Sequence, residues 1–244
     1  MKNLGKFSVA TMIIISLSSS AAAEGLFVGG ELGVNFAYVE AKDNAKINYF
    51  GTYSTNHSSG AVGAGGVKFG YDFDLWRIYG AFVYNSGQDY EYSSYVSTNT
   101  PPISTNEHYE LDMENNSIDL LIGANWTPQI SNNFKMLIGP YVGYSRLNTD
   151  ITYDYHRIES NSGIITRTKQ ENEQTVKQNG VLYGAKFGGI FTFARRHEID
   201  FGVKYDCVKY GDKGDISFSP DIAVSMKNAK RDGVGIYAGY NFKF

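Results

Sequence analysis

The chain has 244 residues, which fits a single domain. Its formal net charge of −3 argues against a nucleic-acid partner, and its single cysteine, Cys207, excludes an internal disulfide. Its 19 Tyr, 15 Phe and 27 Gly, beside only 5 Pro, favour an all-β protein.

The first 23 residues have the pattern of a cleavable signal peptide. Lys2 and Lys6 precede an apolar stretch over 7–17, and Ala21, Ala22 and Ala23 supply the small residues of a cleavage site. The apolar stretch is too short to cross a bilayer as a helix. We therefore expect residues 1–23 to be the signal peptide and residues 24–244 to form the folded domain.

Eight segments of the remaining chain alternate apolar with small or polar residues at a period of two, which is typical of β-strands. They are 26–38, 61–72, 76–85, 117–126, 134–145, 181–192, 198–206 and 233–244. The alternation alone fits two kinds of protein. A soluble sandwich buries its apolar face, whereas a membrane barrel turns that face to lipid.

The lengths of the connections separate these two readings. Short connections at 73–75, 127–133 and 194–196 alternate with long ones at 41–60, 86–116, 147–179 and 209–232. This regular alternation is typical of an outer-membrane barrel, whose turns are periplasmic and whose long loops are extracellular.

Aromatic residues also gather where the two ends of such a barrel would lie. One rim would carry Phe73, Trp76, Trp126, Phe134, Phe193 and Phe244, and the opposite rim Tyr38, Tyr84, Tyr144 and Tyr205. Two such belts are what the two membrane–water interfaces select. The sequence therefore predicts an all-β fold, an eight-stranded antiparallel up-and-down transmembrane β-barrel.

The ending Tyr240-Asn241-Phe242-Lys243-Phe244 resembles the C-terminal signature of bacterial outer-membrane barrels. With the signal peptide and the strand count, the chain resembles the OmpA/OmpX-type family of small eight-stranded barrels. The resemblance implies the outer membrane of a Gram-negative bacterium, with both termini periplasmic, the long loops extracellular, and outer-membrane lipid and lipopolysaccharide as neighbours. It also implies that the barrel-assembly machinery reads Tyr240, Phe242 and Phe244, residues that equally suit a lipid-facing girdle.

The less apolar face of the strands carries six acidic and six basic residues, which we assign to the lumen. They are Glu31, Lys68, Asp72, Arg77, Asp119, Lys135, Lys186, Glu198, Asp200, Lys204, Asp206 and Lys243. Unpaired buried charges are unfavourable, and the interior of eight strands is about filled by side chains. We expect a salt-bridged plug; the alternative is a gated ion path.

No enzyme site is evident in the sequence. Some barrels that resemble this chain modify lipid A and need a histidine beside a serine. His57, His108 and His156 fall in the long connections and His197 at a short turn, without a recognisable motif. No cluster has metal-ligand spacing, so we assign no catalytic residue, metal or cofactor.

The connection 86–116 contains no Lys or Arg, and its tyrosines lie among acidic residues. Tyr90, Tyr92, Tyr95 and Tyr109 form a candidate contact surface for a host or envelope partner, helped by divalent cations. The alternative, which the sequence favours, is a strand pair that extends past the membrane with a solvated acidic face. As a function, we expect a surface-interaction barrel, with a narrow passive channel and a lipid A-modifying enzyme as alternatives.

Overall fold

The computed structural model describes residues 25–47, 51–55, 58–100, 103–162, 164–193, 196–219 and 222–244. The predicted signal peptide and His57 lie outside these ranges, and so do the side chains of Tyr38, Tyr90 and Tyr92. In the part of the chain that is described, no helix has the length and apolar character needed to cross a membrane.

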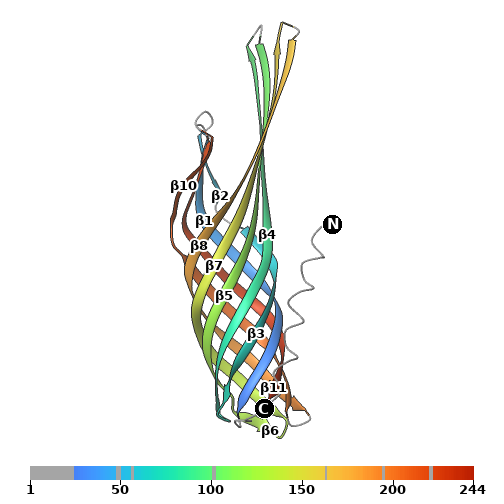
Figure 1. Ribbon diagram of the computed structural model, residues 1–244, viewed down its shortest axis with the longest axis vertical. Helices are drawn as coiled ribbons and strands as arrows, with labels where there is room; N and C mark the ends of the chain where they lie inside the picture. The colour runs from blue at the N-terminus through green and yellow to red at the C-terminus, as the bar shows by residue number, and fades with distance from the viewer. Residues whose placement is uncertain are drawn as a thin grey trace.

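The described chain consists of β-strands that follow one another around a closed ring (Figure 1). They are β1 (Leu26–Ile47), β2 (Gly51–Thr55), β3 (Ser58–Asp72), β4 (Trp76–Thr100), β5 (Ile103–Trp126), β6 (Gln129–Ser131), β7 (Phe134–Asn161), β8 (Ile164–Phe193), β9 (His197–Tyr210), β10 (Lys213–Ser219) and β11 (Ile222–Lys243). The ring runs β1-β3-β4-β5-β7-β8-β9-β11, every pairing is antiparallel, and β11 closes onto β1. The predicted eight-stranded up-and-down barrel is thus confirmed, and β2, β6 and β10 are short additions to it.

The outside of the barrel is an apolar band, because the period-two alternation turns one face of every strand outward. Leu32, Phe69, Ile122, Phe187 and Ile236 all have more than half of their surface exposed. Trp76 pairs with Trp126 at the end that carries the short turns, here called the turn end; the opposite end is the hairpin end. A band of exposed aliphatic side chains with aromatic rims is the surface that hydrocarbon and its interfaces require.

Inside the wall, tyrosine rings lie against glycines on neighbouring strands. Tyr79 on β4 and Tyr141 on β7 both pair with Gly123 of β5, and Tyr141 also pairs with Gly184 of β8. A Cβ on Gly123 would lie 2.5 Å from the Tyr79 ring, and one on Gly184 would lie 2.5 Å from the Tyr141 ring. These glycines therefore make room for interior side chains that fill the lumen.

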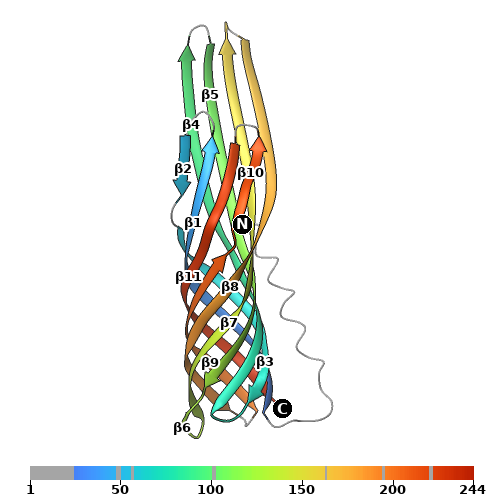
Figure 2. The same ribbon diagram turned by 90° about the vertical axis from the view of Figure 1, so that its left-hand side faces the viewer.

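Beyond the barrel, two of the predicted long loops are strands instead. The ladder of β4 and β5 continues to Thr100↔Ile103, and that of β7 and β8 to Asn161↔Ile164. With the β5–β7 ladder between them, residues 87–100, 103–116, 148–161 and 164–179 form a four-stranded sheet, which we call the tall blade (Figures 1 and 2). Connection 86–116 therefore contains the extended strand pair that the sequence favours.

The opposite side of the ring carries a second, shorter extension. Beyond the wall, β1 and β11 remain paired with each other, and β2 and β10 flank them as the short blade (Figure 2). Among the described residues, the β3–β4 ladder ends at Asn85 and the β8–β9 ladder at Gly180. Two seams therefore separate the blades, and in the tall blade β4 and β8 are free edges.

Candidate functional site

At the turn end of the lumen, one arginine joins three strands. Arg77 on β4 donates to Asp72 Oδ2 of β3 at 2.6 Å and to Glu198 Oε2 of β9 at 2.9 Å. Lys243 Nζ lies 2.9 Å from Asp72 Oδ2, and Lys135 Nζ lies 3.9 Å from Asp72 Oδ1. Because Glu198 is 121 residues from Arg77 in sequence, the turn-end group links distant parts of the ring where the short turns leave it.

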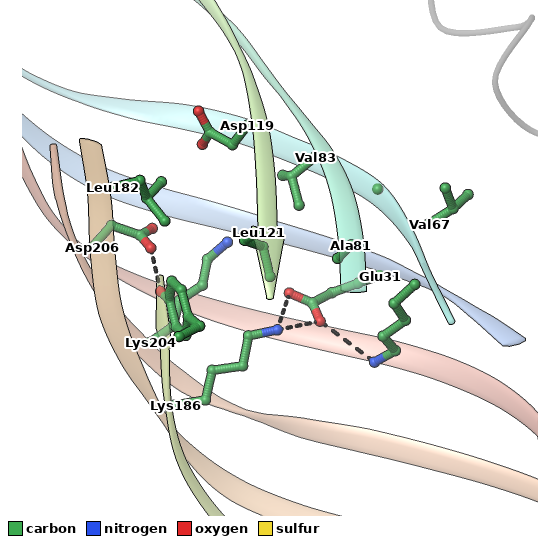
Figure 3. Close-up of a pocket in the computed structure, with 13 residues that line it drawn as sticks. Glu31, Val67, Ala81, Val83, Asp119, Leu121, Leu182, Lys186, Lys204 and Asp206 are labelled. Carbon is green, nitrogen blue, oxygen red and sulfur yellow. Dashed lines mark hydrogen bonds and ion pairs between the residues drawn. The ribbon is translucent and has the colours of Figure 1, made fainter. Parts of the chain in front are cut away.

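In the middle of the lumen, a carboxylate receives two lysines (Figure 3). Glu31 Oε2 on β1 lies 2.6 Å from Lys186 Nζ of β8 and 3.4 Å from Lys68 Nζ of β3. Lys68 also pairs with Asp200 of β9. This central group spans the barrel from wall to wall, so its ion pairs block the axis.

Near the hairpin end, Asp119 on β5 is the common acceptor. It accepts from Arg231 Nη2 at 2.8 Å, from Ser145 Oγ at 2.5 Å and from Asn85 Nδ2 at 2.8 Å. We had not predicted Arg231, because it falls inside the expected connection 209–232. Its position two residues before inward-facing Gly233 was the signal that could have identified it.

Two of the predicted lumen residues do not pair in this way. Asp206 accepts a hydrogen bond from the Tyr141 hydroxyl, and Lys204 has no ion pair with any described residue. Both line a cavity of about 10 Å³ beside the central group, which is space for about one water molecule (Figure 3).

All twelve predicted lumen residues face the interior, and all except Lys204 and Asp206 form an ion pair with another described residue. With Arg231, the described lumen holds seven bases and six acids. Ten of the twelve predicted charges thus have an oppositely charged partner, which offsets the cost of burying them.

The tall blade has an inner face with its own small core. Tyr109 and Tyr155 lie 5.0 Å apart between ring centroids and pack against Ile151, which is fully buried. Both hydroxyls donate to Glu107, at 2.5 and 3.2 Å. Burial, and next the bond to this carboxylate, raises the pKa of Tyr109 above its ordinary value.

The outer face of the tall blade carries the other described member of the predicted tyrosine surface. Tyr95 is 79 % exposed and stacks on His108 with ring centroids 4.1 Å apart. Tyr95 and Tyr109 thus lie on opposite faces of the blade. The cause is a β-bulge between Asn85 and Gln88, which shifts the alternation of β4 relative to β5.

The described histidines contact aromatic residues. His108 and His156 have ring centroids 6.3 Å apart, and His197 Nδ1 lies 2.5 Å from the hydroxyl of Tyr240. No hydrogen bond joins a described histidine to a serine, and the described side chains include no group of three or more potential metal ligands.

The last strand ends in an aromatic cluster at the turn end. Phe242 and Phe244 meet edge to face at 5.3 Å, and the His197 ring lies 5.4 Å from that of Phe242. The backbone amide of Phe244 donates to Leu26 O at 3.0 Å, and the Tyr240 ring is exposed on the outside. These residues complete the aromatic rim of the turn end where β11 pairs with β1 and closes the ring.

No protein-family model matches the chain, and no curated protein matches it. Among solved structures, the chain is similar to Neisserial surface protein A, with 13% identity, a TM-score of 0.39, and coverage of 90% of this chain and 97% of that chain. It is similar to the attachment invasion locus protein of Yersinia pestis, with 14% identity, a TM-score of 0.35, and coverage of 87% and 99%. It is also similar to the outer membrane protein OprG from Pseudomonas aeruginosa, with 13% identity, a TM-score of 0.37, and coverage of 91% of this chain and 97% of that chain. These neighbours are small outer-membrane barrels, the kind of protein that the terminal-strand resemblance predicted. The fold of this chain is established by its own closed ring of eight paired strands.

Proposed function

We propose that the protein is a surface-interaction barrel of the Gram-negative outer membrane, and that the tall blade is its contact surface. In this proposal residues 1–23 are a signal peptide, the turn end and both termini are periplasmic, and the blades are extracellular. The barrel-assembly machinery reads Tyr240, Phe242 and Phe244. The observation that carries the proposal is the continuation of β4, β5, β7 and β8 well beyond a filled barrel.

The two free edges of the tall blade differ in a way that favours β4 as the docking edge. Residues 92–100 of β4 contain no charge, glycine or proline and are mainly Tyr, Ser and Thr, with one Val and one Asn. The β8 edge carries Arg167, Lys169, Glu171 and Glu173. Charges on an edge strand discourage pairing with another chain, so the β8 edge is disfavoured for pairing. The uncharged β4 edge is left to pair with an extended segment of a partner protein.

Edge substitutions test the proposal without touching the barrel. Val96→Lys with Thr98→Lys would place charges on the β4 edge, and Thr166→Lys with Thr168→Lys is the matched change on β8. Host-cell adhesion and serum survival of bacteria that make each variant are compared with those of the parent. We expect loss with the β4 variant alone; unchanged adhesion and survival with that variant would refute the β4 edge as the contact site.

The two alternative functions have their own measurements. A narrow passive channel would give steady conductance in planar bilayers, which the occluded lumen does not favour. A lipid A-modifying enzyme would change the lipid A mass spectrum between a deletion strain and its parent. We expect neither signal.

A further inference from the structure

On three neighbouring strands, an outward-facing tyrosine is followed by an outward-facing base toward the hairpin end. Arg146 is two residues beyond Tyr144 on β7, and Lys209 is four residues beyond Tyr205 on β9. On β8, which runs the other way, Lys177 is six residues beyond Tyr183. The next strand, β11, contributes outward-facing Lys230. We call Arg146, Lys177, Lys209 and Lys230 the basic belt.

The strand register brings two of these residues together, Lys209 and Lys230. Lys209 and Lys230 are direct cross-strand partners, and the same row continues through Val181 to Tyr144. Like charges directly opposite each other on one face destabilise a strand pair. The pair is therefore unfavourable by itself: Asp232 compensates Lys230, and an anion between the two ammonium groups would compensate Lys209.

Among the described acids, only Asp232 compensates a base of the belt. Lys230 forms an ion pair with Asp232. Arg146, Lys177 and Lys209 have no ion pair with any residue whose side chain is described. On β5, the strand next to β7 on the other side, the outward residues beyond the wall include Glu110, Asp112 and Glu114, so acids border the belt there.

The tyrosines give the level of the belt. Tyr144, Tyr183 and Tyr205 are all more than two-fifths exposed and lie where the aliphatic band ends. Tyrosine rings on a barrel exterior mark the membrane–water interface, so bases just beyond them lie at the depth of the lipid headgroups. In the outer leaflet of the proposed outer membrane, those headgroups carry phosphate.

We propose that the basic belt binds the phosphorylated headgroup of an outer-leaflet glycolipid, the lipid A phosphates. Lys209 and Lys230 form the centre of the site, and Arg146 and Lys177 form its flanks. Ammonium and guanidinium groups make charge-assisted hydrogen bonds to phosphate oxygens, and the tyrosine row below supports the apolar part of the lipid. This proposal rests on the proposed membrane location but not on the contact role of the tall blade.

The test uses the purified full barrel in mild detergent with EDTA, so that divalent cations cannot bridge carboxylates to phosphate. Retention of bisphosphorylated lipid A through detergent exchange is measured by native mass spectrometry. The site variant is Lys209→Gln with Lys230→Gln; the matched control, Arg167→Gln with Lys169→Gln, removes two positive charges from the tall blade. Two lost charge-assisted contacts should lower the apparent affinity at least about tenfold in the site variant alone.

Three outcomes would overturn the proposal. The first is equal retention by the parent and the site variant, and the second is an equal loss in the site and control variants, which would reflect net charge only. The third is displacement of lipid A by inorganic phosphate at equal concentration, which would indicate a bare anion site. A faster band without boiling shows that each variant is folded, and cell fractionation tests the membrane location separately.

Discussion

Removing Arg77 tests whether the ion pairs of the turn-end group hold the barrel together. The guanidinium is 2 % exposed and bridges two carboxylates, Asp72 and Glu198, whose side chains are each 1 % exposed. Arg77→Leu would leave these carboxylates buried with Lys243 between them, at 2.9 and 3.7 Å, and with Lys135 3.9 Å from Asp72. Breaking a buried ion pair from one side typically lowers the free energy of unfolding by about 3–5 kcal/mol, and we expect a loss in that range.

The assay is reversible urea unfolding in lipid vesicles, followed by the fluorescence of Trp76 and Trp126. The control is Lys169→Leu, which removes an exposed partner of Glu171 and should change the unfolding free energy by about 0–1 kcal/mol. The double variant Arg77→Leu/Glu198→Leu removes one of the stranded carboxylates, so it should be more stable than Arg77→Leu. If Arg77→Leu lies within about 1 kcal/mol of the parent, the network does not hold the barrel as we argue.

Three further predictions follow from single contacts. Gly184→Val should destabilise the barrel by about 1–3 kcal/mol or more, because its Cβ would lie 2.2 Å from Tyr205 O. An unboiled gel band at the position of the parent's and a urea midpoint equal to the parent's would contradict this. Tyr109 should remain protonated at pH values where an ordinary tyrosine ionises, because its pKa is raised in the fold. The contribution of protonated Tyr109 to the free energy of unfolding is complete below about pH 10 and is lost as the pH rises through the raised pKa. The difference between the absorbance titrations of the parent and Tyr109→Phe at the tyrosinate band reports the ionisation of Tyr109. It should appear only above the pH at which an ordinary tyrosine ionises, and a difference centred near pH 10 would count against the Glu107 contact. Phe244→Ala should reduce the amount of barrel in the outer membrane severalfold while leaving refolding into vesicles nearly unchanged; equal losses in both would assign Phe244 to the girdle alone.

The wall of the barrel could be predicted from the sequence because lipid imposes a strict alternation. Every outward position between the rims has to be apolar, so charged residues such as Glu31 and Lys186, which fall on the alternate positions, can be assigned to the interior. The same rule explains how Arg231 was missed. It lies just beyond the last apolar outward residue of β11, where the alternation that marks a strand disappears although the strand continues.

The tall blade was harder to predict for a related reason. Water contacts its outer face, so residues such as Asp150, Thr152 and Asp154 replace the apolar half of the pattern while Ile151 and Tyr153 build an inner core. The bulge between Asn85 and Gln88 then changes the parity of β4, so Tyr90 pairs with Met113 and Tyr95 with His108. A change of one residue in register has no signature in composition, and it decided which of the tyrosines share a face.

The two seams at Asn85 and Gly180 have a mechanical consequence. Beyond them no ladder of the described residues ties the tall blade to the short one, whereas β4, β5, β7 and β8 continue without interruption into the wall. A pull on the tip of the tall blade along the barrel axis would load these ladders lengthwise, many hydrogen bonds at once, and would leave the short blade unstrained. Force applied to the tall blade would therefore be carried by the wall of the barrel.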